Sequence, residues 1–71
     1  MTRGILEQEL RGLRDEVLLL GSMVEKAIQR SMEALQKRDQ ALSQKVVEED
    51  ALVNAERFRI EERCIQVIAT Q

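Results

Sequence analysis

Apolar residues in the first half of the chain recur at steps of three and four residues. This spacing places them on one face of an α-helix and predicts a single helix over about residues 4–36. A second row on the same side broadens the face, which is typical of a helix that packs against two neighbours. The main row is Leu6, Leu10, Leu13, Val17, Leu20, Val24, Ile28, Ser31 and Leu35, and the flanking row is Ile5, Gly12, Leu19, Met23, Ala27 and Ala34.

A short polar stretch, QKRDQ, follows the first helical pattern. Lys37 and Arg38 suit the C-terminal end of a helix, where backbone carbonyl groups point outward. Asp39 suits the N-terminal cap of the next helix, because its carboxylate can accept hydrogen bonds from free amides. The stretch therefore predicts a tight turn at about 37–39 between antiparallel helices, the second over about residues 40–70. Within the first helix, Gly21 predicts either close approach of another helix or a bend.

The second half of the chain carries two apolar rows that are separated by a polar strip. One row is Leu42, Val46, Val53, Ile60, Cys64 and Val67; the other is Val47, Ala51, Phe58 and Ile65; the strip is Asp50, Asn54, Arg57 and Glu61. A single partner helix can cover only one of these rows. The pattern therefore predicts an all-α fold, an antiparallel helical hairpin that completes a helical bundle as a homo-oligomer, with a dimer favoured.

Composition narrows the classes of function. The chain has 71 residues, enough for one small domain, and its 34% of charged residues are of mixed sign with a net charge of −2. Without a basic surface and with one aromatic residue, the chain is not expected to bind nucleic acid. One cysteine, Cys64, and no histidine exclude an internal disulfide and a Cys/His zinc site. No signal-peptide or membrane-spanning pattern is present, so we expect no membrane insertion and a cytoplasmic location.

Several local motifs are specific enough to suggest a family. They are Glu9-Leu10, the stretch GSMVEKAI at 21–28, Asp50-x-x-x-Asn54-x-Glu56, Ile60-Glu61 and Cys64-Ile65. Together with Thr2-Arg3 at the start, these motifs resemble the beginning of the PhoU family of phosphate-uptake regulators, and the resemblance covers the whole chain. Members of that family repeat a three-helix unit twice. The resemblance implies a partial unit, its first two helices, which is either a piece of a longer chain or a short member that completes its bundle by association.

The resemblance also implies a metal site. In the family, an acidic pair four residues apart on the second helix is associated with bound metal, and the matching positions here are Asp50 and Asn54. Glu49 and Glu61 are weaker candidate ligands, and the ion would be a divalent cation or iron. Residues four apart share one helix face, so their oxygens could bind one cation. The alternative is structural, because the strip would equally form solvated ion pairs, with Asn54 fixing the helix register.

By the same resemblance, the chain is expected to act as a regulator of phosphate uptake and phosphate-starvation signalling. Its partners would be the ATPase subunit of a phosphate transporter and a sensor kinase. A generic oligomerising hairpin adaptor with no phosphate role is the alternative, since periodicity and charge fit it equally. An enzyme is not expected, because the chain has no histidine, no glycine-rich phosphate loop and no nucleophile beside a base.

Overall fold

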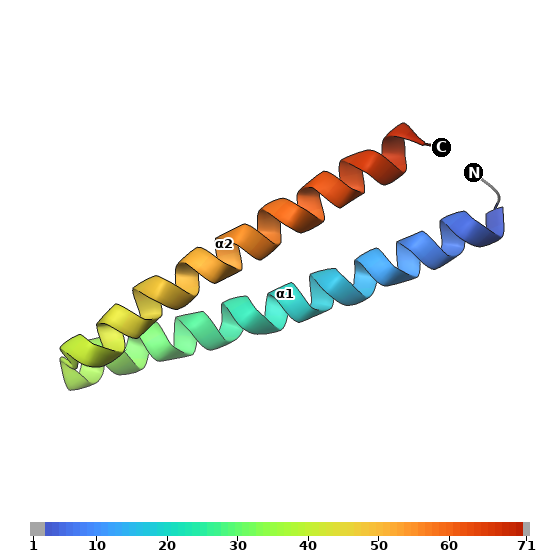
Figure 1. The fold of residues 1–71 in the computed structure, drawn as a ribbon. Helices are drawn as coiled ribbons and strands as arrows, with labels where there is room; N and C mark the ends of the chain where they lie inside the picture. The colour runs from blue at the N-terminus through green and yellow to red at the C-terminus, as the bar shows by residue number, and fades with distance from the viewer. Residues whose placement is uncertain (1–2, 71) are drawn as a thin grey trace.

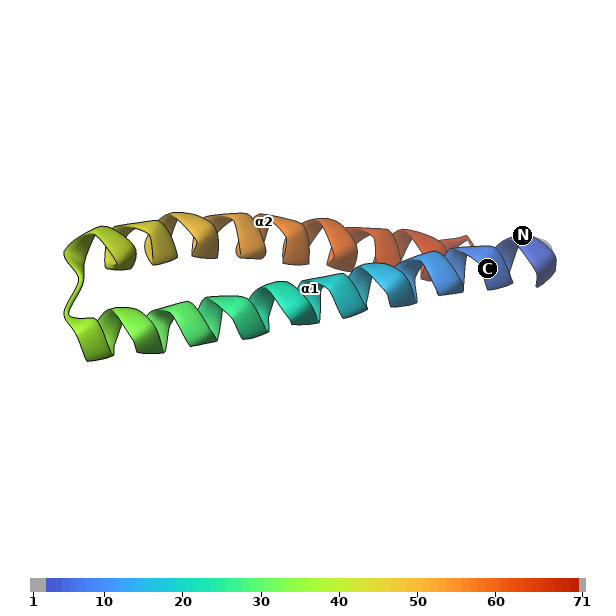
Figure 2. The same cartoon turned by 90° about the horizontal axis from the view of Figure 1, so that it is seen from below.

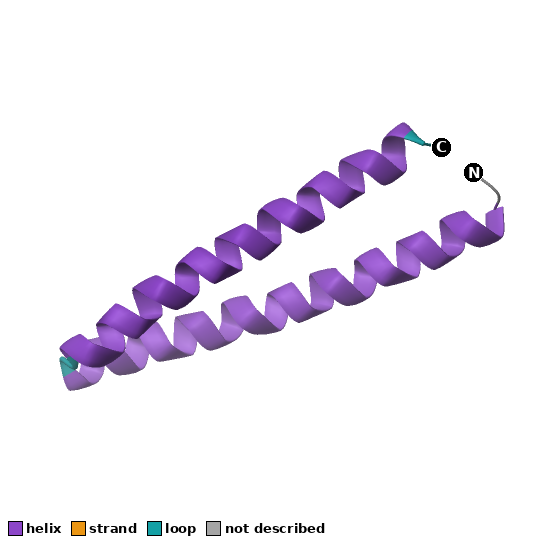
Figure 3. Cartoon of the chain, in the orientation of Figure 1, coloured by secondary structure: helices purple, strands orange, loops and turns teal. Residues whose placement is uncertain are grey.

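The computed structural model describes residues 3–70 and consists of two long antiparallel helices. Helix α1 spans Arg3–Lys37 and helix α2 spans Gln40–Ala69, so each bound lies within one residue of its predicted position. The helices form a slender hairpin with Cα extents of 53 × 15 × 11 Å, and both ends of the chain lie far from the turn (Figure 1). The prediction of an all-α antiparallel hairpin is confirmed (Figure 3). Thr2, part of the family motif, lies outside the described residues.

The turn ends α1 with two backbone hydrogen bonds that are typical of a Schellman motif. The N–H of Arg38 donates to the carbonyl of Leu35 at 3.4 Å, and the N–H of Asp39 donates to the carbonyl of Ala34 at 3.2 Å. Arg38 has a φ of 51°, in the left-handed region that usually favours glycine. Placing arginine there therefore carries a conformational cost.

Asp39 begins α2 as predicted. Its backbone is extended, with φ −90° and ψ 109°, and its Oδ1 accepts a hydrogen bond from the N–H of Leu42 at 3.1 Å. The cap satisfies one of the amides that lack a partner in the first turn of a helix. The chain therefore reverses direction over two residues, with a defined end for one helix and a defined start for the next.

Side chains at every seventh position hold the helices together. The inward set on α1 is Leu6, Leu13, Leu20, Ala27 and Ala34, and on α2 it is Val46, Val53, Ile60 and Val67. Four of these are buried, with exposed fractions of 4–7%: Leu13, Ala34, Ile60 and Val67. A seven-residue repeat is typical of helices that wind about each other. In Figure 1 the gap between the two ribbons widens toward the chain ends, whereas in Figure 2, seen at 90°, it widens toward the turn. The helices are therefore inclined to each other and not parallel, which is consistent with such winding.

The apolar face of α1 is divided by the packing. The inward set contacts α2, but the residues between its members are exposed by 40–78%: Leu10, Val17, Val24, Ile28 and Leu35. The sequence pattern predicted one continuous face, and the structure shows that α2 covers only one arc of it. The reason is geometric, since successive residues of the row differ by 40–60° around the helix and one antiparallel partner covers a narrow arc.

The close approach expected at Gly21 is not made within the hairpin. A Cβ atom built at Gly21 would meet nothing within 4 Å, whereas one at Gly12 would lie 3.3 Å from Nη2 of Arg63. Gly12 is therefore the glycine that faces the second helix, and the close approach predicted at Gly21 is not made by α2. Within the described residues, neither helix is long and apolar enough to cross a membrane.

Candidate interaction surfaces and polar strip

One edge of the hairpin is closed by ion pairs between the two helices. Arg63 donates to Oε2 of Glu9 at 3.0 Å and to Oε1 of Glu16 at 2.7 Å, and Arg59 reaches Glu16 at 3.4 Å. Nearer the turn, Arg30 of α1 pairs with Glu49 of α2. We call this side of the hairpin the ion-paired edge.

The charges on the ion-paired edge favour the ionised arginines. The pKa of Arg63 is raised, first by its hydrogen bond to Glu9 and then by the nearby negative charge of Glu16, while burial opposes the rise. The pKa of Arg59 is also raised, mainly by its hydrogen bond to Glu56. Because Arg63 bridges residues seven apart on α1, the network fixes the register between the helices near the chain ends.

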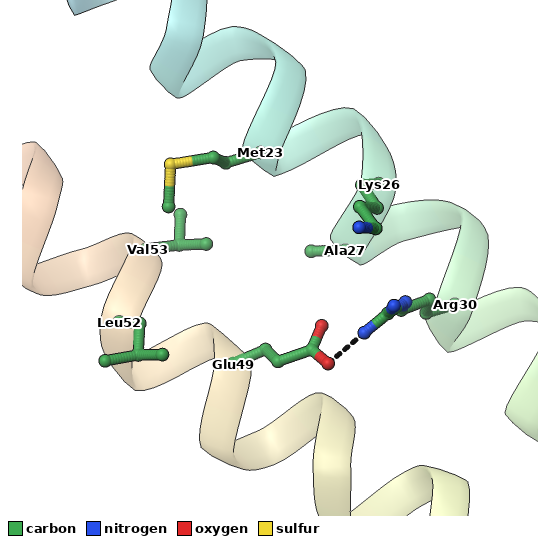
Figure 4. A pocket seen from close by; sticks show the side chains of 7 residues that line it. All are labelled: Met23, Lys26, Ala27, Arg30, Glu49, Leu52 and Val53. Atoms are coloured by element: carbon green, nitrogen blue, oxygen red, sulfur yellow. Dashed lines mark hydrogen bonds and ion pairs between the residues drawn. The ribbon is translucent and has the colours of Figure 1, made fainter.

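A shallow cleft of about 270 Å³ opens between the helices on this same edge (Figure 4). It is lined by Met23, Lys26, Ala27, Arg30, Glu49, Leu52 and Val53. The cleft forms opposite Ala27, whose short side chain leaves space that a larger residue would fill. Met23 and Val53 point toward each other on one side, and the Arg30–Glu49 pair spans the other. These two charges satisfy each other, so Lys26 is the remaining charged side chain in the lining that could orient a small ligand.

The polar strip of α2 is made of contacts within the helix. Nδ2 of Asn54 donates to Oδ2 of Asp50 at 3.3 Å, and Nη1 of Arg57 donates to Oε1 of Glu61 at 2.9 Å. The guanidinium of Arg57 also lies 4.5 Å from the centre of the Phe58 ring. All four residues of the strip are exposed, so each contact contributes little to stability.

The four candidate metal ligands are not brought together. Asp50 and Asn54 lie side by side, but Glu61 is paired with Arg57, and Glu49 reaches across to Arg30 on the ion-paired edge. Among the described residues, no group of three His, Cys, Asp or Glu side chains could hold a metal ion. One carboxylate and one amide oxygen supply two of the six to eight oxygen ligands that Ca²⁺ takes. These residues do not complete such a site on their own, and the metal site stays a prediction that needs further ligands from outside the hairpin.

The second apolar row of α2 is left uncovered by α1, as the sequence predicts. The exposed fractions are 65% for Val47, 60% for Phe58 and 66% for Ile65. Cys64 belongs to the first row and is half-buried as a free thiol. Both helices thus keep an apolar face that the hairpin does not cover. Exposed apolar faces of this extent mark contact with another helix or another protein.

An all-α hairpin with an uncovered apolar face on each helix is typical of one part of a helical-bundle protein. Comparison with known families agrees: the profile described as "PhoU domain" matches residues 17–71. The chain belongs to the PhoU family, which confirms the resemblance.

Two relatives illustrate the match. The "Phosphate-specific transport system accessory protein PhoU homolog" of Clostridium acetobutylicum is 39% identical over 71 residues, which are 100% of this chain and 32% of the relative. The "Phosphate-specific transport system accessory protein PhoU" of Escherichia coli K12 is 33% identical over 66 residues, which are 93% of this chain and 27% of the relative. The chain thus spans about a third or less of these relatives. No solved structure matches it.

Proposed function

We propose that the chain acts in the regulation of phosphate uptake and phosphate-starvation signalling, as a protein-binding module and not as a catalyst. The observation that carries the proposal is the match, over 93–100% of the chain, to relatives that are named accessory proteins of the phosphate-specific transport system. The fold also supports the proposal, because what the hairpin offers to a partner is the exposed surface of its two helices. The carboxylates of Glu9, Glu16 and Glu49 are engaged by arginines, which suits structural roles better than proton transfer.

In this proposal, the chain presents helix faces to its partners. The partners are the ATPase subunit of a phosphate transporter and a sensor kinase, and the place of action is the cytoplasm, where an ATPase subunit is reached. Val47, Phe58 and Ile65 supply the apolar centre of one contact face, and the polar strip supplies its rim. An apolar centre with a polar rim is the usual composition of a protein interface. The module works as a homo-oligomer, with a dimer favoured.

A phosphate-responsive reporter tests the proposal in the native cell. Deleting the gene is expected to switch on the phosphate-starvation response in phosphate-rich medium, and the wild-type gene is expected to restore repression. Ile65→Glu, which places a charge in the exposed row, is expected to fail to restore it. Gln66→Glu is the matched control, since it adds the same side chain at the next exposed position.

Helix content measured by circular dichroism shows whether both variants fold. Normal repression in the deletion strain would refute the phosphate role and favour the generic adaptor. Repression restored by a folded Ile65→Glu variant would refute the assigned face.

A further inference from the structure

Gly12 lies between two carboxylates on one face of α1. Glu9 comes three residues before it and Glu16 four residues after it, and this spacing places all three on the same side of the helix. Arg63 of α2 lies against this side. Its Nη2 donates to Oε2 of Glu9 at 3.0 Å, and its Nη1 donates to Oε1 of Glu16 at 2.7 Å. We call Glu9, Glu16 and Arg63 together the clasp.

The missing side chain of Gly12 makes room for the clasp. A Cβ atom at this position would lie 3.3 Å from Nη2 of Arg63, which is tighter than an ordinary contact. Because the guanidinium is held by a carboxylate at each end, it cannot move away from a larger side chain without lengthening one of its two hydrogen bonds. Gly12 is therefore the seat of Arg63.

No other described residue of the same row on α1 offers such a seat. The residues at steps of seven from Gly12 all carry longer side chains, and they are Ile5, Leu19, Lys26 and Glu33. Glycine in the interior of a helix is unfavourable compared with any of these residues. The place that it leaves for the arginine is a physical reason for its presence at position 12.

The closed clasp leaves one carboxylate oxygen without a donor. Oε1 of Glu16 accepts from Arg63 and, at 3.4 Å, from Arg59, whereas Oε2 is buried and has no hydrogen-bond partner among the described residues. A buried acceptor without a donor costs free energy, and water satisfies it when the site opens. The closed and open states of the clasp therefore differ by less free energy than the ion pairs alone would give.

The clasp lies in a part of the hairpin that packs separately from the turn. Leu13, Ile60 and Val67 are buried in this part, whereas the buried residue near the turn is Ala34. Between the two parts lies the cleft of about 270 Å³, where the packing of the helices is interrupted on the ion-paired edge. We call residues 3–20 of α1 and 56–69 of α2 the chain-end half.

The two parts are also joined by different bonds. Near the turn, the Arg30–Glu49 pair and the capped connection at Asp39 keep the helices together. In the chain-end half, no covalent link is near, and the clasp joins the helices beside the apolar contact. Helix segments that lose their packing are marginal in water, so opening of this half alone would be seen as faster exchange of its amide hydrogens.

We propose that the clasp, seated on Gly12, is a conformational device that controls local opening of the chain-end half. When Arg63 is seated, this half stays closed. When salt screens the clasp or a side chain fills the seat, the half opens while the helices stay paired near the turn. All the groups belong to one hairpin, so the device depends neither on the phosphate role nor on a second copy.

A double-mutant cycle read by residue-resolved amide hydrogen exchange tests the seat. Gly12→Leu fills the seat, and Arg63→Ala removes the side chain that occupies it. We expect Gly12→Leu to speed exchange at Leu13 and Ile60 about tenfold in the wild-type background. In the Arg63→Ala background we expect less than about threefold, because no guanidinium is then displaced.

Gly21→Leu is the matched control for the cycle. It makes the same change on the same helix, at a position where a Cβ atom would meet nothing within 4 Å, so we expect no faster exchange at Leu13 and Ile60. An equal rise in Gly21→Leu, or the same rise from Gly12→Leu with and without Arg63, would overturn the seat.

Salt tests the clasp in the wild-type chain, so the result does not depend on whether Gly12→Leu folds. The side chains of the clasp are 24–36% exposed, and raising NaCl from 0.1 to 1 M shortens the screening length from roughly 10 Å to 3 Å. We expect exchange at Leu13 and Ile60, relative to Ala34, to rise about fivefold, and at most about twofold in Arg63→Met. An unchanged ratio in the wild type, or an equal rise in Arg63→Met, would overturn the proposal. Neither measurement involves phosphate signalling, so each can fail independently of the proposed function.

Discussion

Truncation of Ile60 is the sharpest test of how the hairpin is held together. Ile60 is 4% exposed and lies in the middle of the inward set of α2. Ile60→Ala removes about three methylene equivalents from contact with α1, a loss of roughly 2.4 kcal/mol from transfer alone. The space left behind adds to this loss when neighbours cannot close in, so we expect a total of about 2–4 kcal/mol.

Urea unfolding followed by circular dichroism at 222 nm measures the loss. Ile68→Ala is the matched control, because Ile68 is on the same helix but is 70% exposed, and we expect it to cost less than about 1 kcal/mol. A small fold has few kcal/mol to lose, so Ile60→Ala is also expected to lower the helix signal without denaturant. If Ile60→Ala is too unfolded to measure, Ile60→Val replaces it in the comparison with Ile68→Ala. We expect Ile60→Val to cost about 0.5–1.5 kcal/mol. Equal destabilisation by the two alanine variants would refute the assigned packing.

The remaining predictions concern the turn and the polar strip. Arg38→Gly should stabilise the chain by about 0.5–1 kcal/mol in urea unfolding, since glycine relieves the left-handed backbone, and no gain would contradict that strain. Asp39→Ala should cost about 1 kcal/mol by the same assay, and an unchanged midpoint would contradict the cap. If Asp50 and Asn54 ligate a metal, Mn²⁺ at its Kd should add about 0.4 kcal/mol to stability in wild type but not in Asp50→Asn. Identical melting with and without Mn²⁺, Fe²⁺, Zn²⁺ and Mg²⁺ would remove the metal prediction.

Much of the fold was predictable because the local signals agree. The seven-residue spacing of Val46, Val53, Ile60 and Val67 and the cap at Asp39 all point to the same hairpin. The second apolar row was also predictable, since Phe58 lies too far around the helix for a single partner to reach. Such agreement between periodicity, capping and charge is what lets a sequence specify one structure.

Other features could not be predicted from periodicity alone. Which half of the α1 row turns inward depends on side chains of α2, because Arg63 anchors Glu9 and Glu16 beside the contact and so leaves Leu10 outside. The signal was present as carboxylates seven residues apart, facing arginines on the other helix. It can be interpreted only once the register of the hairpin is known.

The candidate metal ligands show the same limit. Spacing of four residues correctly placed Asp50 beside Asn54. It did not reveal that Glu49 would be drawn to Arg30 on the other helix, since that pair depends on the packing of α1 against α2.

In the proposed homo-oligomer, a second copy of the chain covers apolar surface that the hairpin leaves exposed. Sedimentation equilibrium of the wild-type chain at 5–100 µM measures whether this association occurs. We expect a folded species of about twice the 8.2 kDa chain mass, which dissociates only on dilution. A fully helical species that remains at 8.2 kDa over the whole concentration range would contradict it.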